Sequence, residues 1–148
     1  VGVAVMGIVV LGEGASPAHP FNPLAALRLC VAAGTTTRAI DAIFDAIWRE
    51  GRPGDDVATL ATAAAVLDIA DPAAATAEAA VKQRLRANTD AALAAGVFGV
   101  PTLAIDGELF WGNDSHPLIQ AVLDDPGLLR SGALADVGAI PVGVERRH

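Results

Sequence analysis

Apolar residues recur every three or four positions through most of the chain, which is the spacing of an amphipathic helix. The clearest case is the segment 35–51, where the apolar positions at i, i+3, i+4, i+7 and i+8 are Ile40, Ile43, Phe44, Ile47 and Trp48. Similar patterns predict helices over 23–34, 55–70 and 73–95, the last of them interrupted near residue 78. Most of the chain is therefore expected to be helical.

Residues that favour helix ends support these boundaries. Asn22 is a good N-cap residue with Pro23 at the first helical position, and Asp71-Pro72 repeats the arrangement. In the segment 55–70 we expect one buried face, made of Val57, Leu60, Ala61, Ala64 and Leu67.

After residue 95 the spacing of the apolar residues changes from that of a helix to that of a strand. Residues 102–105 and 108–111 read as two short strands joined at Asp106-Gly107, a hairpin signal, and Asp114 or Ser115 can cap a final helix. Two short strands do not make a sheet with an interior. Three explanations stay open: a strand from residues 1–10, a strand from a partner chain, or a missing part of the domain.

Composition and charge narrow the class of protein. The 148 residues suit one domain, and 53% of them are hydrophobic, many of them alanine. A net charge of −7 argues against binding to a nucleic-acid backbone. No apolar segment reaches the ~20 residues that a membrane-spanning helix needs, so we expect no membrane partner.

The single cysteine, Cys30, excludes an intrachain disulfide, a Cys-x-x-Cys redox pair and a cysteine zinc cage. This usage fits a reducing cytoplasm, and the helical setting of Cys30 favours a buried structural residue. The histidines, His19, His116 and His148, are scattered and give no metal-binding pair, so we predict no metal site. "VVLGEGAS" lacks the third glycine of a dinucleotide-binding loop and reads as an ordinary loop.

The stretch "GVFGVPTLAIDGELFWGND" at 96–114 carries the best candidate for binding chemistry. If the Val100-Pro101 bond is cis, the backbone N–H and C=O of Val100 are left to pair with an extended peptide. The helix start at Gly112-Asn113-Asp114-Ser115 offers a carboxylate for an ammonium group and free N–H groups for a carboxylate. The backbone groups of Val100 and this helix start together would suit a zwitterionic peptide end, although local chemistry alone favours a simple cap and turn.

"VKQRLRANTDAALAAGVFGVPTLAIDGELFWGND" resembles the C-terminal half of the 2-hydroxychromene-2-carboxylate isomerases, relatives of kappa-class glutathione transferases in the DsbA-type thioredoxin superfamily. "HPFNPLAALRLCVAAG" resembles the start of their helical insertion, and the resemblance runs from about His19 to Ile119. It implies an α/β thioredoxin-like fold of the DsbA type with a helical insertion. The chain then divides into an atypical segment 1–18, the insertion 19–95, a hairpin and helix 96–123, and an irregular tail 124–148.

The resemblance also implies a ligand and its contacts. Pro101 matches the family's cis-proline, and Val100 matches the residue whose backbone pairs with the cysteinyl part of glutathione. Asn113 and Asp114 match the loop that meets the γ-glutamyl end. Ser115, which is also expected to bind glutathione, stands where family members usually carry an arginine. The implied reaction is a glutathione-dependent cis–trans isomerisation of a small aromatic acid in aromatic-compound degradation, by a cytoplasmic homodimer.

The front of the chain departs from this family. Its strand, serine-bearing helix and second strand are not recognisable in "VGVAVMGIVVLGEGASPA", so we assign no catalytic residue and expect this chain to be inactive or nearly so. Two alternatives are a non-catalytic thioredoxin-like or helical binding module and a kappa-type glutathione transferase. A disulfide oxidoreductase is disfavoured by the single cysteine.

Overall fold

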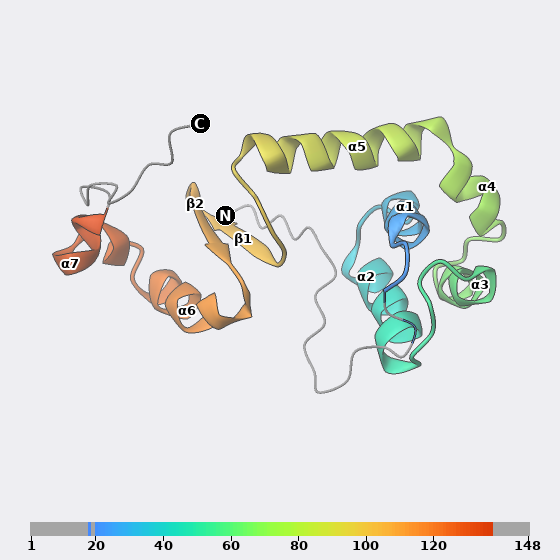
Figure 1. Cartoon of the computed structure of the whole chain (residues 1–148), viewed down its shortest axis with the longest axis horizontal. Coiled ribbons are helices and arrows are strands. Elements are labelled where there is room, and N and C mark those ends of the chain that lie inside the picture. The colour runs from blue at the N-terminus through green and yellow to red at the C-terminus, as the bar shows by residue number, and fades with distance from the viewer. Residues whose placement is uncertain (1–17, 19, 138–148) are drawn as a thin grey trace, which may run out of the picture. The chain divides into compact units, whose positions relative to one another are not determined.

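The computed structural model describes residues 18 and 20–137, and the chain divides into two compact units between Phe98 and Gly99. We call the described residues up to Phe98 the helical unit and residues 99–137 the hairpin unit. In Figure 1 the helical unit runs from blue to yellow-green, and the hairpin unit runs from yellow-orange to red. The predictions for residues 1–10, His19 and His148 lie outside the described residues.

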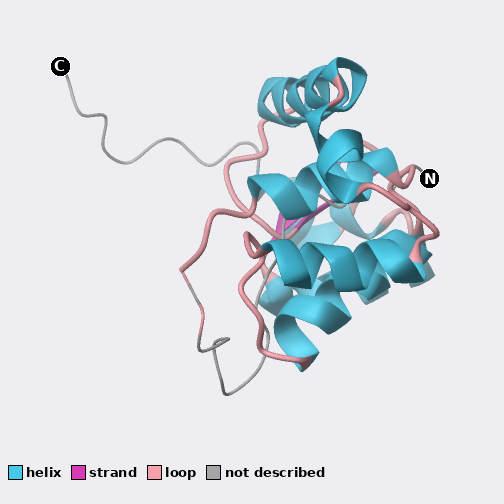
Figure 2. Ribbon diagram, turned by 90° about the vertical axis from the view of Figure 1, so that its right-hand side faces the viewer, coloured by secondary structure: helices cyan, strands magenta, loops and turns pink. Residues whose placement is uncertain are grey.

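The regular secondary structure described in the helical unit consists of helices, which are cyan in Figure 2. A helix forms in each segment where the apolar spacing predicted one, and the predicted interruption near 78 is confirmed because Glu78 separates the last two helices. Their bounds are α1 Leu24–Ala32, α2 Thr37–Phe44, α3 Val57–Val66, α4 Pro72–Ala77 and α5 Ala79–Ala94. None of the described helices is long and apolar enough to cross a membrane.

Short polar side chains fix where three of these helices begin. Thr36, Asp56 and Asp71 each accept a hydrogen bond from a backbone N–H in the first turn, at 3.2, 2.9 and 2.9 Å. At α1 the cap position is held by Pro23 rather than by the predicted Asn22. Asn22 still contributes there, because its Oδ1 accepts a hydrogen bond of 3.0 Å from the N–H of Leu24.

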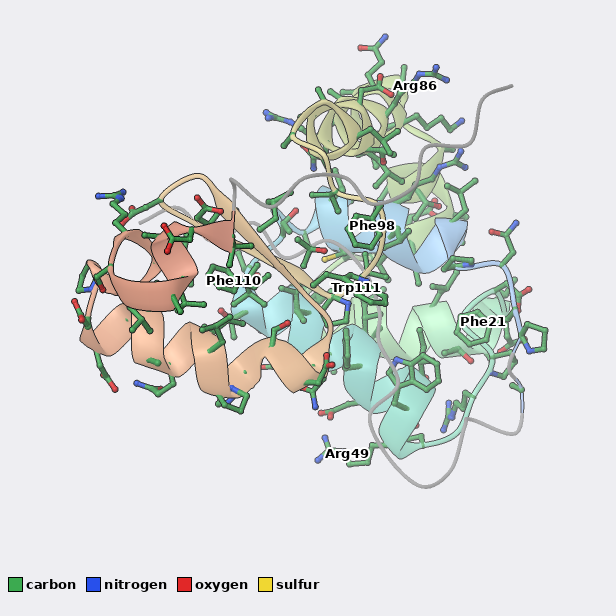
Figure 3. The ribbon with its side chains drawn as sticks, turned by 60° about the vertical axis from the view of Figure 1, so that its left-hand side comes forward. Phe21, Arg49, Arg86, Phe98, Phe110 and Trp111 are labelled. Atoms are coloured by element: carbon green, nitrogen blue, oxygen red, sulfur yellow. The ribbon has the colours of Figure 1, made fainter. Side chains whose placement is uncertain are left out.

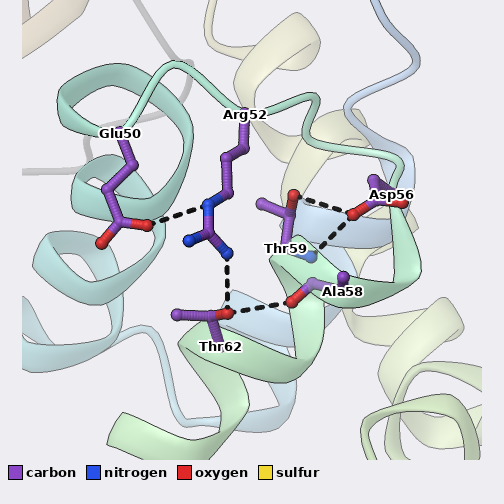
Figure 4. Close-up of polar contacts among 6 residues, drawn as sticks. All are labelled: Glu50, Arg52, Asp56, Ala58, Thr59 and Thr62. Atoms are coloured by element: carbon purple, nitrogen blue, oxygen red, sulfur yellow. Dashed lines mark hydrogen bonds and ion pairs between the residues drawn. The ribbon is translucent and has the colours of Figure 1, made fainter.

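The start of α3 carries a small polar network (Figure 4). Asp56 accepts hydrogen bonds from both the backbone N–H and the hydroxyl of Thr59, at 2.9 and 3.2 Å. The backbone N–H of Thr59 is the main reason why the pKa of the Asp56 carboxyl is lowered. Arg52 bridges the preceding turn to α3, since it pairs with Glu50 at 3.0 Å and donates to Thr62 at 3.1 Å.

The core of the helical unit combines a few large aliphatic side chains with several alanines. Leu29 and Ile47 are its largest fully buried side chains, and the other members are Ala26, Ile43, Ala46, Ala63 and Ala64. The predicted face of α3 is partly wrong, because Val57 is 79% exposed while Thr59 and Ala63 are buried. Small residues at the buried positions let α3 approach its neighbours closely, and its many alanines give too weak a pattern to predict the face.

The predicted helix 35–51 changes its winding part of the way along. It is an α-helix as far as Phe44 and continues as a π-helix, η1, over Asp45–Arg49. The hydrogen bonds of a π-helical turn span five residues instead of four, so the wider turn rotates the positions that follow. Ile47 remains buried in this turn, and Trp48 packs against the same core.

The hairpin unit starts with two antiparallel strands, β1 Thr102–Ile105 and β2 Glu108–Trp111. Thr102 pairs with Trp111 and Leu103 with Phe110, and the predicted turn at Asp106-Gly107 has φ values of 49° and 91°. Positive φ at both central residues is the reason why Asp-Gly is favoured there. The hairpin prediction is confirmed.

A helix packs on one face of this hairpin and completes a second core. A 3₁₀ turn, η2 Asn113–Ser115, leads into α6 His116–Asp124. The buried residues of this core are Ile105, Phe110, Ile119 and Val122. Since side chains alternate along a strand, Phe110 and Trp111 lie on opposite sides of the hairpin (Figure 3).

The tail after α6 was predicted to be irregular, and its described part corrects that prediction. It contains a 3₁₀ turn, η3 Leu128–Arg130, and a short helix, α7 Gly132–Ala135. Leu128 and Leu129 pack against the hairpin core, which explains why this segment is ordered. Elements of three or four residues are too short to produce a periodic pattern in the sequence.

Candidate functional site

The Val100-Pro101 peptide bond is cis, as the family resemblance implied. Val100 is 43% exposed, and within the described residues its N–H and C=O take part in no backbone hydrogen bond. The residue therefore presents a backbone donor and acceptor directly before strand β1 begins. This is the arrangement that lets an extended peptide pair with a protein backbone.

Three hydrogen bonds hold the segments on either side of this position. The hydroxyl of Thr102 donates to the Gly99 carbonyl at 2.7 Å, and the N–H of Gly112 donates to the Pro101 carbonyl at 2.9 Å. The hydroxyl of Ser115 donates to the Trp111 carbonyl at 2.5 Å. The bond between Gly112 and Pro101 joins the loop before β1 to the loop after β2, and the other two bonds stabilise each loop locally.

The backbone conformation of Gly112 influences where the predicted acidic residue, Asp114, lies in this loop. Its backbone has φ 88° and ψ 158°, a conformation that essentially only glycine adopts. A Cβ at Gly112 would lie 2.5 Å from Oδ1 of Asp114, so the carboxylate of Asp114 lies against the glycine. Asn113 and Asp114 are both exposed, and their side chains are available to a ligand.

Ser115 has a different local role from the one predicted. It occupies the N-cap position of α6, but its hydroxyl makes no capping hydrogen bond and bonds to the Trp111 carbonyl instead. Pro117 lies in the first turn of α6 and has no N–H to satisfy. Ser115 therefore stabilises the end of β2 and leaves the first turn of the helix without a side-chain cap.

The sequence did not single out Trp111 as part of this site. A Cβ at Gly99 would lie 2.4 Å from Nε1 of Trp111, so the indole rests directly on Gly99. Trp111 is 52% exposed even though it is the largest side chain of the hairpin. The only sequence signal was a tryptophan directly before Gly112, and pairing across the hairpin is needed to see that it reaches Gly99.

A hollow with a volume of about 420 Å³ lies on the helical unit. It is lined by charged residues of α2 and η1, among them Arg38, Asp41, Asp45 and Arg49, and by Val66 of α3. Arg38 is already paired with Asp68 at 3.0 Å and also donates to the Val66 carbonyl, while Arg49 is paired with Asp45. The two arginines therefore satisfy their charge within the protein, which makes this hollow a weaker candidate than the hairpin site.

Other candidate chemistry is sparse in the described part of the chain. Cys30 is half buried and packs against the helical core, and this burial raises the pKa of its thiol, as expected for a structural cysteine. Over residues 18 and 20–137, no group of three or more His, Cys, Asp or Glu side chains is arranged to hold a metal ion. The described residues thus concentrate their candidate binding groups at the hairpin.

Comparisons with known proteins bear on the family and the fold of the chain. The family model for the DSBA-like thioredoxin domain matches residues 15–124. Among solved structures, a 2-hydroxychromene-2-carboxylate isomerase matches with a TM-score of 0.58 and 25% sequence identity, over 71% of this chain and 55% of that chain. The comparison with curated proteins found no match.

The match covers little more than half of that isomerase's length. Together with the family model, it confirms the resemblance and the thioredoxin-like, mostly helical fold class expected from the sequence. Because the family model covers most of its residues, the chain belongs to the DSBA-like thioredoxin domain family.

Proposed function

We propose that the hairpin unit of this chain binds glutathione for an isomerisation of the 2-hydroxychromene-2-carboxylate type, while the chain by itself is still expected to be inactive or nearly so. The observation that carries the proposal is the exposed backbone of Val100 beside the cis-proline, with the Asp114 carboxylate at the neighbouring loop. The similarity to a solved isomerase supports the choice of reaction class. The small aromatic acid substrate, the homodimer and the cytoplasmic setting stay predictions.

The two parts of the site would recognise different parts of the tripeptide. The N–H and C=O of Val100 suit the amide groups of the cysteinyl residue, since each ligand amide offers a complementary acceptor and donor. The Asp114 carboxylate suits the ammonium group of the γ-glutamyl residue. Pro101 holds the turn between Val100 and β1, while Asn113 and Ser115 shape the loop that carries Asp114.

Binding is the decisive test, because no residue that activates the thiol is assigned among the described residues. Calorimetric titration should show that glutathione binds at a single site more tightly than the dipeptide Cys-Gly, which lacks the γ-glutamyl group. Asp114→Asn should reduce this preference roughly three- to tenfold, since the carboxylate is exposed and water screens part of the attraction.

Glu108→Gln is the matched control, because it removes the same charge from an exposed residue at the other end of β2. It should leave the preference for glutathione as it is in the unmodified protein. A chain that does not bind glutathione, or an Asp114→Asn variant that behaves like Glu108→Gln, would contradict the proposal.

A further inference from the structure

Strand β1 carries backbone groups on the edge that faces away from β2. The two strands form the only sheet in the described part of the chain, so this edge of β1 has no neighbouring strand there. The N–H of Gly112 donates to the Pro101 carbonyl, which therefore points toward the β2 side. Backbone groups alternate between the two edges along a strand, so the N–H and C=O of Thr102 and Ala104 point outward.

The sequence of β1 leaves this edge open to a further strand. Proteins commonly protect a free edge with a charged residue, a proline or a bulge, because unpaired backbone groups attract other strands. The four residues of β1 read Thr-Leu-Ala-Ile, and they include neither a charged residue nor a proline. The strand also pairs with β2 residue by residue, without a bulge. The edge therefore has the properties of a strand that lies inside a sheet.

Helix α6 indicates that the sheet is wider than two strands. Ile119 and Val122 of this helix are buried against the hairpin. Leu118 and Leu123 lie on the two sides of that buried stripe, because successive residues of a helix are about 100° apart. They are 40% and 51% exposed, so the apolar face of α6 extends beyond the surface that the hairpin covers. A third strand would widen the sheet by about 4.8 Å.

We propose that residues 3–6 of this chain form a third strand on the free edge of β1. These residues precede the described part of the chain and read Val-Ala-Val-Met between Gly2 and Gly7, so the run is as long as β1. A short run without polar side chains is typical of a strand that is covered on both faces, and valine is favoured in strands. Three strands with an apolar face also form a more stable unit than an isolated hairpin.

The charge of the chain favours this occupant over a strand from a second copy. Each copy carries a net charge of −7, so two copies repel each other, whereas residues 1–10 carry no charged side chain. Pairing within one chain also avoids the loss of translational and rotational freedom that association of two chains requires. The uncharged N-terminal segment is therefore the better partner for the edge.

Amide hydrogen exchange, followed residue by residue by NMR on the full chain, tests the pairing directly. The outward amides, those of Thr102 and Ala104, should exchange at least roughly tenfold more slowly than unpaired amides, because the third strand accepts their hydrogens. The reference amides, those of Leu103 and Ile105, face β2 and should be protected whatever occupies the edge. Nuclear Overhauser effects between residues 3–6 and β1 should accompany the protection of the outward amides.

A pair of proline variants identifies the segment. Val5→Pro/Met6→Pro removes two adjacent N–H groups, and one of them faces β1 because such groups alternate along a strand. This variant should return the outward amides to fast exchange, while the reference amides stay protected. Val9→Pro/Val10→Pro is the matched control, because it makes the same change at two apolar residues outside the proposed strand. It should leave the outward amides protected.

Several results would overturn the inference. Fast exchange of the outward amides in the unmodified protein does so without any variant, and so does protection that survives Val5→Pro/Met6→Pro. Overhauser effects that join β1 to a segment other than residues 3–6 contradict it as well. Protection that appears only where light scattering detects a dimer would make a second copy the occupant. None of these results depends on glutathione, so the proposed function is tested separately.

Discussion

Replacing Gly112 by alanine should separate the stability of the hairpin from its ability to bind a ligand. The backbone of Gly112 lies at φ 88° and ψ 158°, where a residue with a Cβ is strained by about 1–3 kcal/mol. The new Cβ would also lie 2.5 Å from Oδ1 of Asp114. The Asp114 side chain can rotate away, so this second effect costs little stability but displaces the carboxylate. We expect Gly112→Ala to weaken both the hairpin and its preference for glutathione over Cys-Gly.

Gly107→Ala is the matched control for the strain alone. Gly107 has φ 91° in the hairpin turn, and a Cβ there would meet no atom within 4 Å. Its cost should be about 1–2 kcal/mol, close to that of Gly112→Ala, with no effect on Asp114. The two variants therefore differ in their expected binding rather than in their expected stability.

Both quantities are measurable on the same samples. Urea unfolding followed by Trp111 fluorescence in a Trp48→Phe background reports on the hairpin, and calorimetry gives the ratio of glutathione to Cys-Gly affinity. The reasoning fails if Gly107→Ala lowers this ratio as much as Gly112→Ala does, because general loosening of the hairpin would then explain the effect. It also fails if Gly112→Ala leaves the unfolding midpoint unchanged.

Three further predictions concern the helical unit. Leu29→Ala should lower the free energy of unfolding by about 2–5 kcal/mol, measured by urea unfolding followed by circular dichroism, because Leu29 is 0% exposed. The same change at Leu24, which lies on the same helix and is 40% exposed, should cost far less. Equal costs would contradict the assigned core. Gly54→Ala should cost about 1–3 kcal/mol in the same assay, since its Cβ would lie 2.4 Å from the Phe21 ring and 2.9 Å from Ile47; a neutral result would show that this contact is loose. The hydrogen bonds that lower the pKa of Asp56 stabilise the fold at pH values above the ordinary carboxyl pKa, and this stabilisation is lost as the pH falls through the lowered pKa. Asp56→Asn should therefore lose less stability in acid than the unmodified protein does. Identical pH profiles of stability would rule out this role of Asp56.

The elements were predictable wherever local chemistry decides them. Apolar spacing, capping side chains and glycine breaks act within a few residues, so the helices and the Asp106-Gly107 hairpin could be read directly from the sequence. The buried face of α3 was not, because alanine contributes little to the contrast between its faces and Thr59 is buried through packing against other helices. The π-helical turn after Phe44 was missed for a similar reason, since its apolar spacing also fits an ordinary helix.

Only part of the candidate site could be predicted from the sequence, for a related physical reason. Asp114 and Val100 carry chemistry in their own groups, so residue type and the family resemblance could single them out. The position of Trp111 depends instead on Gly99, because a side chain at Gly99 would occupy the space where the indole lies. Gly112 acts in the same way for Asp114. In both cases a glycine makes room for a neighbouring side chain, and the requirement appears only when β1 and β2 are paired. The residues that permit the hairpin's conformation are therefore the same residues that place its candidate ligand groups, which is why each binding experiment needs a control with equal strain and an untouched site.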